Sequence, residues 1–166
     1  MNPNLYEKHR GIYRLRDEIG LPEGRVLLLL QNTITGKVIE EEYKNLFVTV
    51  GRNAVANRLI GQDKGQITYC ALGTGTNAPA AGNTTLQTEV FRKLIATREI
   101  SSVGNNIASF TTFYNTGEAN ATLREAALFG DAATATADSG TLFARVAINR
   151  TKTSADTLTV YWTVAV

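Results

Sequence analysis

The sequence predicts a mainly β protein, an antiparallel β-sandwich of jelly-roll-like type, with one short helix and an N-terminal arm. Three observations predict this fold class. From Gln66 onward, short runs rich in β-branched and aromatic residues are separated by clusters of Gly, Asn, Ser and Thr. The last run, residues 157–166, alternates apolar and polar side chains with the period of two that marks a half-buried strand. Residues 51–61 place apolar side chains at helical spacing before a closing Gly.

The chain length predicts a single domain with an extension. Its 166 residues lie within the usual single-domain size of roughly 100–200 residues. Residues 1–24 carry mixed charges and end in "LPEG", a turn signal. Two interpretations of this segment stay open, a frayed terminus with a short helix and an arm that docks on a neighbouring subunit. Residues 25–166 are expected to form the β-sandwich domain.

The elements of that domain follow in order along the chain. Residues 26–31 and 38–43 flank the turn residues "NTITGK" and predict a hairpin. The helix near 51–61 is expected to group its apolar residues on one side, namely Ala54, Val55, Leu59 and Ile60. The strands expected after the helix are "ITYCALGTG", "FRKLIATREISSV", "IASFTTFYN", "ATLREAALFG", "TLFARVAIN" and "DTLTVYWTVAV".

The composition excludes several classes of partner and site. A formal charge of +2 lacks the basic excess that drives binding to a phosphate backbone, so we expect no nucleic acid. The apolar run "VLLLL" is far shorter than the about 20 residues that cross a bilayer, so we expect no membrane segment. Cys70 and His9 are the only residues of their types, so disulfides and metal sites are not expected and Cys70 is predicted to be a buried structural thiol.

No catalytic or cofactor motif emerges from the sequence. The glycines of "ALGTGTNAP" lack the Gly-Lys-Ser/Thr of a phosphate loop and the third glycine of a dinucleotide fingerprint, so no cofactor is expected. No Ser lies in a nucleophile-elbow setting, and the spacing of the acidic residues does not indicate a catalytic pair. The sequence therefore predicts a protein that is not an enzyme.

Several ordered motifs in the last hundred residues resemble those of a known family. They are a Leu-Gly turn, a Pro-bearing loop, a Leu-x-x-Glu-Val-x-Arg stretch, an Arg-Glu-x-x-Leu-Phe strand and a closing Ser-x-Asp-x-Leu-Thr-Val strand. This set resembles the phage tail-collar fibre family and related small virion structural proteins of tailed bacteriophages. The motifs lie at Ala71 to Gly75, Pro79, Leu86 to Arg92, Arg124 to Phe129 and Ser154 to Val160.

The resemblance implies a non-enzymatic virion structural protein, assembled in the bacterial host cytoplasm, that contacts other virion proteins and copies of itself. Tail or collar fibre attachment is the first expectation, because no fibre repeat or host-range tip follows the module before Val166. A head-associated capsid decoration protein is the second. A host-surface glycan-binding module stays open, with Tyr161 as the surface candidate and Trp162 assigned to the core.

The stretch "TLREAALF" places two adjacent charges, Arg124 and Glu125, inside an apolar strand. In strict alternation they point to opposite faces, so one of them meets a buried side or an intersubunit seam and needs a partner. We expect Glu125 to pair with Arg92, and Arg124 to pair with Glu89 or with a neighbouring subunit, which makes these four residues structural or assembly sites. The rival interpretation is that Glu125 is an active-site carboxylate.

Overall fold

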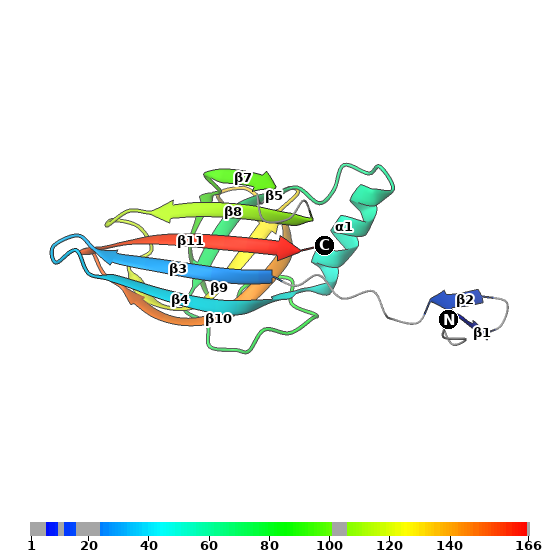
Figure 1. Cartoon of the computed structure of the whole chain (residues 1–166), viewed down its shortest axis with the longest axis horizontal. Helices are drawn as coiled ribbons and strands as arrows, with labels where there is room; N and C mark the ends of the chain where they lie inside the picture. Colours follow the sequence, from blue (N-terminus) through cyan, green and yellow to red (C-terminus); the bar gives the residue numbers. More distant parts are fainter. Residues whose placement is uncertain (1–5, 10–11, 16–23, 101–105, 166) are drawn as a thin grey trace.

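The computed structural model describes residues 6–9, 12–15, 24–100 and 106–165. Within these ranges the chain is mainly β with one helix, which confirms the predicted class (Figure 1). The elements are β1 (Tyr6–His9), β2 (Ile12–Leu15), β3 (Gly24–Asn32), β4 (Val38–Phe47), α1 (Thr49–Leu59), β5 (Ile67–Gly73), β6 (Glu89–Leu94), β7 (Thr97–Ile100), β8 (Ile107–Tyr114), β9 (Ala121–Gly130), β10 (Thr141–Lys152) and β11 (Asp156–Ala165).

Strands β1 and β2 form an antiparallel hairpin of their own in the predicted arm. The short helix predicted for this segment is therefore wrong for residues 6–9 and 12–15. Tyr6, Ile12 and Tyr13 are residue types that favour extended backbone over helix, which is consistent with the hairpin. The rest of residues 1–23, and with it the prediction that the arm docks on a neighbour, lies outside the described residues.

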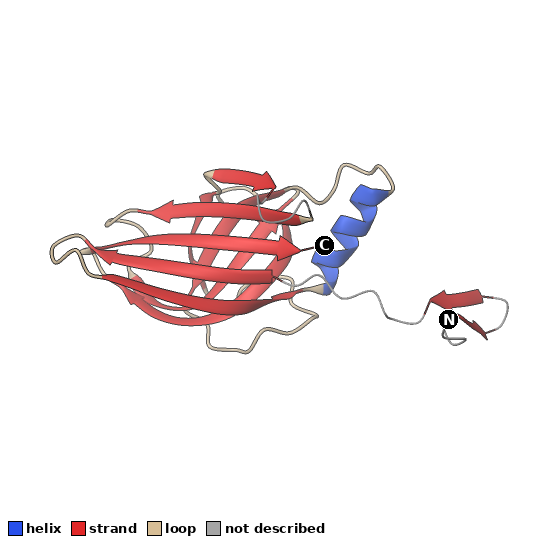
Figure 2. Ribbon diagram, in the orientation of Figure 1, coloured by secondary structure: helices blue, strands red, loops and turns tan. Residues whose placement is uncertain are grey.

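The other described strands form one antiparallel sheet in the order β6-β5-β9-β10-β4-β3-β11-β8-β7. The sheet curls over itself into two layers, one built from β4, β3, β11, β8 and β7 and the other from β10, β9, β5 and β6 (Figure 2). Strand β4 bends from one layer toward the other, and only its end pairs with β10, at Leu46↔Arg145 and Phe47↔Ala144. The predicted sandwich is thus confirmed, and both of its layers belong to a single sheet.

The opposite margin of the curled sheet is bridged by the chain itself. Strand β6 passes into β7 through Ile95 and Ala96, which change from one layer to the other. The Ile95 amide donates to the carbonyl of Thr68 in β5, and the Ala96 amide donates to the carbonyl of Thr111 in β8. These two hydrogen bonds hold the two edge strands of the sheet close to each other.

The interior between the layers is filled by the apolar side of each strand. In β11, Leu158, Val160 and Trp162 are fully buried and Val164 is nearly so, whereas Tyr161 on the other face is 38% exposed. The period-two alternation predicted for this strand is confirmed over the residues described. Burial of this apolar surface is the main force that holds the layers together.

The outer face of the β5-β9-β10 layer is also covered. A second apolar cluster lies there and is built from Val48, Ala71, Leu86, Ala127, Phe129 and Leu142. Leu86 belongs to the loop between β5 and β6, and Val48 immediately precedes α1. Strand β9 therefore has neighbours on both faces, which explains why its second half is buried at every position.

Helix α1 packs across β10 through its first turns. The predicted range of 51–61 is shifted by two residues, and Gly61, with φ of +83°, ends the helix as expected. Gly51 and Ala54 are the buried positions. Leu59 and Ile60, which the sequence groups with Ala54 and Val55 on one side of the helix, are 83% and 74% exposed, so this apolar side is not buried along its whole length. The second half of α1 projects past the end of the sheet (Figure 1), so these side chains have no layer to pack on.

Replacing Gly51 by Ala is expected to destabilise the protein by roughly 1–3 kcal/mol, the cost of overpacking. An added Cβ would lie 2.5 Å from the carbonyl oxygen and 2.6 Å from the Cα of Phe143 in β10. In the same helix, replacing exposed Asn53 by Ala should instead stabilise by about 0.5 kcal/mol through helix propensity. Urea unfolding of both variants measures the difference, and a stabilising Gly51→Ala substitution would contradict the close packing of α1 on β10.

Candidate functional site

Three of the four residues singled out in the sequence, Glu89, Arg92 and Glu125, lie in buried ion pairs on the outer side of the β6-β5-β9-β10 layer. Glu125 in β9 and Arg145 in β10 point to the same side of their strands. The Arg145 Nη2 donates to Glu125 Oε2 over 2.7 Å, and the two side chains are 2% and 1% exposed. The pair is therefore removed from water, where its members depend on each other and on further hydrogen bonds.

Backbone amides of the loop between β5 and β6, residues 74–88, complete the coordination of Glu125. Its Oε1 accepts hydrogen bonds from the amides of Gly75 at 3.0 Å and Thr88 at 2.8 Å. Its Oε2 accepts from the amide of Gln87 at 3.0 Å, besides Arg145. Both oxygens are thus saturated by donors from the protein.

Arg145 holds the same loop through both of its Nη atoms. Its Nη1 donates to Asn83 Oδ1 at 2.7 Å, and its Nη2 also donates to the Asn77 carbonyl at 3.0 Å. The Asn83 Oδ1 in turn accepts from the Ala80 amide. One buried Glu–Arg pair therefore fixes both ends and the middle of a long Gly- and Asn-rich loop on the sheet.

The glycines of the "ALGTG" turn allow the loop to approach this carboxylate. A Cβ at Gly75 would lie 2.5 Å from Glu125 Oε1, and a Cβ at Gly73 would lie 2.6 Å from the same atom. Both contacts are closer than any side chain tolerates, so a residue without Cβ is required at each position. The glycines of this turn thus let backbone amides of the chain approach the Glu125 carboxylate.

Glu89 and Arg92, both in β6, form a second buried pair that fixes the loop between β9 and β10, residues 131–140. Arg92 Nε donates to Glu89 Oε1 at 2.5 Å and its Nη2 donates to Glu89 Oε2 at 2.7 Å, with side chains 3% and 2% exposed. The Arg92 Nη1 donates to the carbonyls of Thr134 and Ser139. The guanidinium also lies 4.5 Å from the ring centroid of Phe129, a cation–π contact.

The predicted pairing of Glu125 with Arg92 and of Arg124 with Glu89 is wrong, although all four residues lie in the same layer. Arg124 is half-buried and forms no hydrogen bond or ion pair with the residues that the structure describes. The register of β6 on β5 skips Val90, a bulge that turns Glu89 and Arg92 to the same face and lets them pair with each other. Glu125 therefore pairs with Arg145 in β10, the strand on the other side of β9.

Arg145 was missed, although the sequence carries a signal for it. In "TLFARVAIN" a single charge stands among apolar β-formers, as Glu125 does in "TLREAALF". Two lone opposite charges in adjacent buried strands are each expensive without a partner. That reasoning predicts their pairing once the strands are known to be neighbours.

A further buried charge, Lys152 at the end of β10, fixes the loop between β8 and β9. Its Nζ donates to the Asn115 carbonyl and to Asn120 Oδ1, each at 2.8 Å. Burial lowers the pKa of the Lys152 ammonium. In the same loop, burial alone would raise the pKa of Glu118, but hydrogen bonds from Lys93 and the Asn115 amide lower it overall. Each of three polar loops is thus anchored to the sheet by charged side chains.

Asp156 makes the stability of the protein depend on pH in the acidic range. Hydrogen bonds from the hydroxyl and amide of Thr153, and then from the amide group of Asn32, lower the pKa of the Asp156 carboxyl. A lowered folded-state pKa means that the carboxylate stabilises the fold above its unfolded pKa of about 3.9. This contribution should be lost as the pH falls below about 4. Urea midpoints between pH 7 and 2 should fall less steeply for Asp156→Asn, and equal slopes would contradict this assignment.

Cys70 is confirmed as a buried thiol. It is fully buried in β5, and burial raises the pKa of its thiol. The hydroxyl of Tyr114 in β8 donates to the Cys70 carbonyl at 2.9 Å across the interior. The contact ties the two layers together beside the buried thiol.

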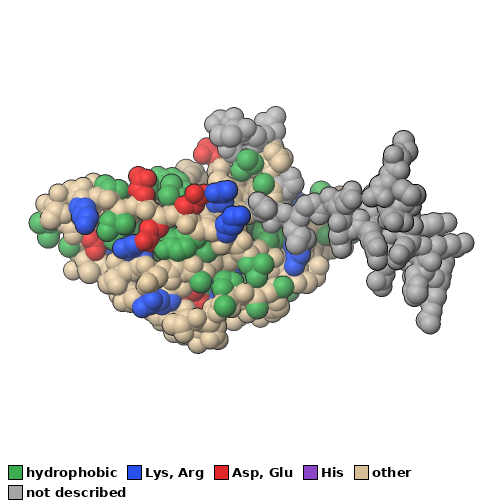
Figure 3. Space-filling view, turned by 60° about the horizontal axis from the view of Figure 1, so that its bottom comes forward, with side chains coloured by type: hydrophobic (Ala, Val, Ile, Leu, Met, Phe, Trp, Pro, Cys, Tyr) green, Lys and Arg blue, Asp and Glu red, His purple; other side chains and the backbone are tan. Residues whose placement is uncertain are grey.

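The outer face of the other layer, on β3, β11 and β8, carries an apolar stripe defined by Leu27, Leu29, Tyr161 and Phe113. Leu27 pairs with Tyr161, and Thr159 links Leu29 to Phe113 across the strands, so the four side chains form one contiguous patch. Phe113 is 47% exposed. Apolar side chains lie among acidic and basic ones on the side of the molecule seen in Figure 3. Neither of the two apolar clusters includes a described loop or helix residue that packs on this face.

The part of the chain that the structure describes holds neither a metal cluster nor a membrane-spanning helix. No group of three or more His, Cys, Asp or Glu there could hold a metal ion. The helix found there lacks the length and apolar content to cross a bilayer. Comparison of the chain with protein-family models, curated proteins and solved structures finds no match.

Proposed function

We propose that this chain is a non-enzymatic structural protein of a tailed bacteriophage particle, acting in tail or collar fibre attachment as an adaptor. It would assemble in the bacterial host cytoplasm through contacts with copies of itself and with other virion proteins. The sequence resemblance to the tail-collar fibre family motivates the phage assignment. The observation that carries the assembly role is the apolar stripe of Leu27, Leu29, Tyr161 and Phe113, on a sheet face that none of the described loops covers.

The surroundings of the stripe are those of a protein contact surface. Two of its four members are aromatic, and aromatic side chains are enriched at the centres of interfaces. The neighbouring strand β4 presents Glu40, Glu42 and Lys44 on its exposed side, which would form a charged rim. A standard interface buries roughly 800 Å² on each partner, so the stripe would be its centre and β4 part of its edge.

The buried charges support the same proposal. Glu125, the strongest candidate for a catalytic carboxylate, accepts four hydrogen bonds from the protein and is 1% exposed. A general base must reach a substrate proton within hydrogen-bond distance. The carboxylate is instead committed to loop anchoring, a role suited to a rigid building block.

Replacing Phe113 by Glu should weaken self-association at least tenfold, because a carboxylate would have to be desolvated at the centre of the interface. The side chain is already half-exposed, so the melting temperature should stay close to that of the parent. The matched control replaces Ile34 by Glu, because Ile34 is a turn residue outside the stripe that is 82% exposed. Sedimentation velocity across a concentration series measures both. A parent chain that stays monomeric at tens of micromolar, or a Phe113→Glu chain that associates equally well, would contradict the proposal.

A host-surface glycan-binding module is the second candidate, favoured by one observation on the same face. Tyr161 is exposed between Thr159 and Thr163 in β11, which gives an aromatic platform flanked by hydroxyl groups. A glycan array with the purified chain and with Tyr161→Ala tests it. A saturable hit lost in the variant supports sugar recognition.

The head-associated decoration role would use the same protein contacts. The position of the chain in a cryo-EM map of the particle distinguishes it from a tail position.

A further inference from the structure

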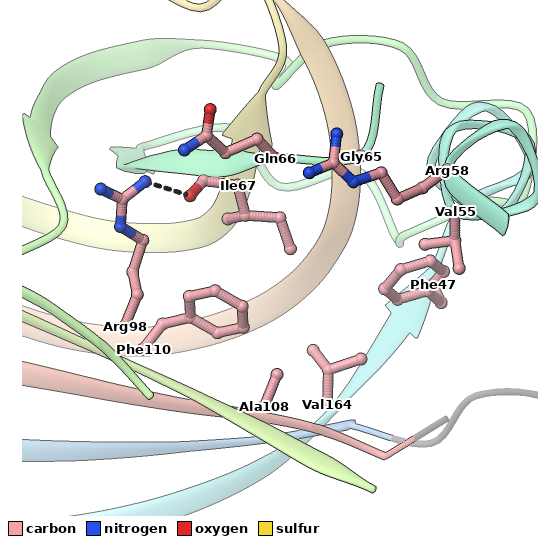
Figure 4. Close-up of a pocket in the computed structure, with 10 residues that line it drawn as sticks. All are labelled: Phe47, Val55, Arg58, Gly65, Gln66, Ile67, Arg98, Ala108, Phe110 and Val164. Carbon is pink, nitrogen blue, oxygen red and sulfur yellow. Dashed lines mark hydrogen bonds between the residues drawn. The ribbon is translucent and has the colours of Figure 1, made fainter. Parts of the chain in front are cut away.

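A pocket opens at the end of the curled sheet where β11 ends, beside the second half of α1. Its volume is about 450 Å³, within the roughly 300–1,000 Å³ of pockets that hold small molecules. Figure 4 shows its walls, which come from α1, β7 and β8 and from the adjoining ends of β4, β5 and β11. It lies away from the apolar stripe and from the buried ion pairs, so neither role described above accounts for it.

The floor and walls of the pocket are apolar. They are formed by six side chains, Phe47, Val55, Ile67, Ala108, Phe110 and Val164. The two phenylalanines are 6% and 8% exposed and Val164 is 3% exposed, so they form a preformed surface continuous with the core. An apolar body that entered the pocket would be desolvated on several sides, which favours binding by roughly 25 cal/mol for each Å² buried.

The rim of the pocket is cationic. Arg98 from β7 and Arg58 from α1 approach from opposite sides above the apolar floor, with the carboxamide of Gln66 between them (Figure 4). Arg98 donates from Nη1 to the carbonyl of Ile67 at 3.3 Å, and no carboxylate among the described residues pairs with it. The lining residues include no Asp or Glu. The polar part of a ligand held here would therefore meet donors and positive charge.

Arg58 is available to such a ligand despite its ion pair. Its Nη1 contacts Asp63 Oδ1 at 2.9 Å, but the two side chains are 60% and 101% exposed. Exposed pairs of this kind contribute roughly 0–1 kcal/mol and exchange readily with water. A carboxylate or sulfonate between the two guanidinium groups would gain charge-assisted hydrogen bonds from both sides.

We propose that this pocket binds a small organic anion with an apolar body, such as a medium-chain carboxylate or an aryl sulfonate. The anionic group lies between Arg58 and Arg98, and the apolar body lies against Phe47, Phe110 and Val164. This inference does not depend on the assembly role. A monomeric chain would carry the same pocket.

The test uses the full chain and two pairs of probes. 8-Anilinonaphthalene-1-sulfonate, followed by fluorescence, is compared with the uncharged N-phenyl-1-naphthylamine, and decanoate is compared with decanol as a competitor. The parent should bind the sulfonate saturably at one site, and decanoate should displace it better than decanol. Amide shifts in a ¹⁵N NMR titration should concentrate at Ile67, Ala108 and Val164.

Three variants locate the binding, with one matched control. Arg98→Gln and Arg58→Gln should each weaken sulfonate binding about fivefold to tenfold, the loss of roughly 1 kcal/mol or more on removing a charged donor, while leaving the uncharged probe unchanged. Ala108→Trp fills the pocket and should abolish binding of both probes. Arg52→Gln, on the same helix but outside the lining, should change nothing. Urea midpoints of all variants confirm that they are folded.

Two results would overturn the proposal. The first is an absence of saturable binding by the folded parent. The second is sulfonate binding that both arginine variants leave intact, which would mean that the pocket does not select an anion. If Ala108→Trp fails to fold, the arginine variants decide, since both side chains lie at the exposed rim.

Discussion

Replacing Glu125 by Gln is expected to destabilise the domain by about 3–5 kcal/mol, the cost of leaving one member of a buried ion pair without its partner. The loss has two sources. Arg145, 2% exposed, would retain its charge without a carboxylate. The amide nitrogen of the new side chain would also face donors, because three backbone amides and the guanidinium all point at the two carboxylate oxygens. Urea unfolding followed by circular dichroism measures the change in free energy.

The exposed pair of Arg25 and Glu42 offers the matched control. Its side chains are 58% and 53% exposed, so Glu42→Gln should cost no more than about 1 kcal/mol. A double variant, Glu125→Leu with Arg145→Met, should stay destabilised, because it removes the uncompensated charge but leaves the amides of Gly75, Gln87 and Thr88 without an acceptor. If Glu125→Gln costs as little as Glu42→Gln, the pair is not the anchor described here. If it abolishes an enzymatic activity while the stability stays unchanged, the catalytic interpretation of Glu125 is the correct one.

The three anchored loops explain why a small β protein buries so many charges. The segments 74–88, 131–140 and 115–120 are rich in Gly, Asn, Ser and Thr and contribute few apolar side chains. A loop of this composition gains little from the hydrophobic effect and has many backbone groups that need partners. A buried carboxylate or guanidinium satisfies several of those groups at once, as Glu125 does for Gly75, Gln87 and Thr88. The result is a fixed outer surface on one layer.

Strand β11 shows what local pattern could predict. It is central in its layer, with the core on one side and the uncovered face on the other, so strict alternation of apolar and polar residues follows from its environment. The hairpin of β3 and β4 and the position of α1 were predictable for similar reasons, since turn residues and a terminating glycine mark their ends. In each case the signal lies within about ten residues of the element that it predicts.

Strand β9 shows where local pattern fails. Leu123 joins the interior cluster together with Ala126 and Leu128, which have the opposite parity, so strict alternation does not hold across Arg124 and Glu125. The outer face of β9 is buried because the loop of residues 74–88, the loop of residues 131–140 that directly follows β9, and the start of α1 cover it. No local signal indicates that polar loops fold back over a strand. The partners of the charged residues depend on that coverage, and therefore they could not be read from spacing alone.

The bulge in β6 is a second effect beyond the reach of the sequence pattern. Residues at i and i+3 in a regular strand point to opposite faces. Skipping Val90 in the register with β5 brings Glu89 and Arg92 to one face, where they pair. Bulges depend on how two strands fit together, so the pairing of Glu89 with Arg92 follows from the ladder between β5 and β6.

Replacing Arg92 by Met should cost about 3–5 kcal/mol, because Glu89 would stay buried at 2% exposure without its counter-charge. The effect should also be local, in contrast to that of a core cavity. Arg92 holds the carbonyls of Thr134 and Ser139, and Glu89 Oε2 accepts from the Asp138 amide. Hydrogen exchange of amides in residues 131–140 should therefore accelerate more than that of amides in β11.

Arg92→Lys separates charge from geometry at the same position. A lysine keeps the positive charge, but it cannot donate two parallel hydrogen bonds to Glu89 and also reach the loop carbonyls. Each buried carbonyl left unsatisfied costs roughly 1–3 kcal/mol, so the lysine variant should fall between the parent and Arg92→Met. The double variant Glu89→Gln with Arg92→Met should be more stable than Arg92→Met alone, because it removes the buried anion. A lysine variant as stable as the parent would mean that charge alone matters. Uniform exchange across the sheet in Arg92→Met would mean that the pair supports the whole fold and not this loop.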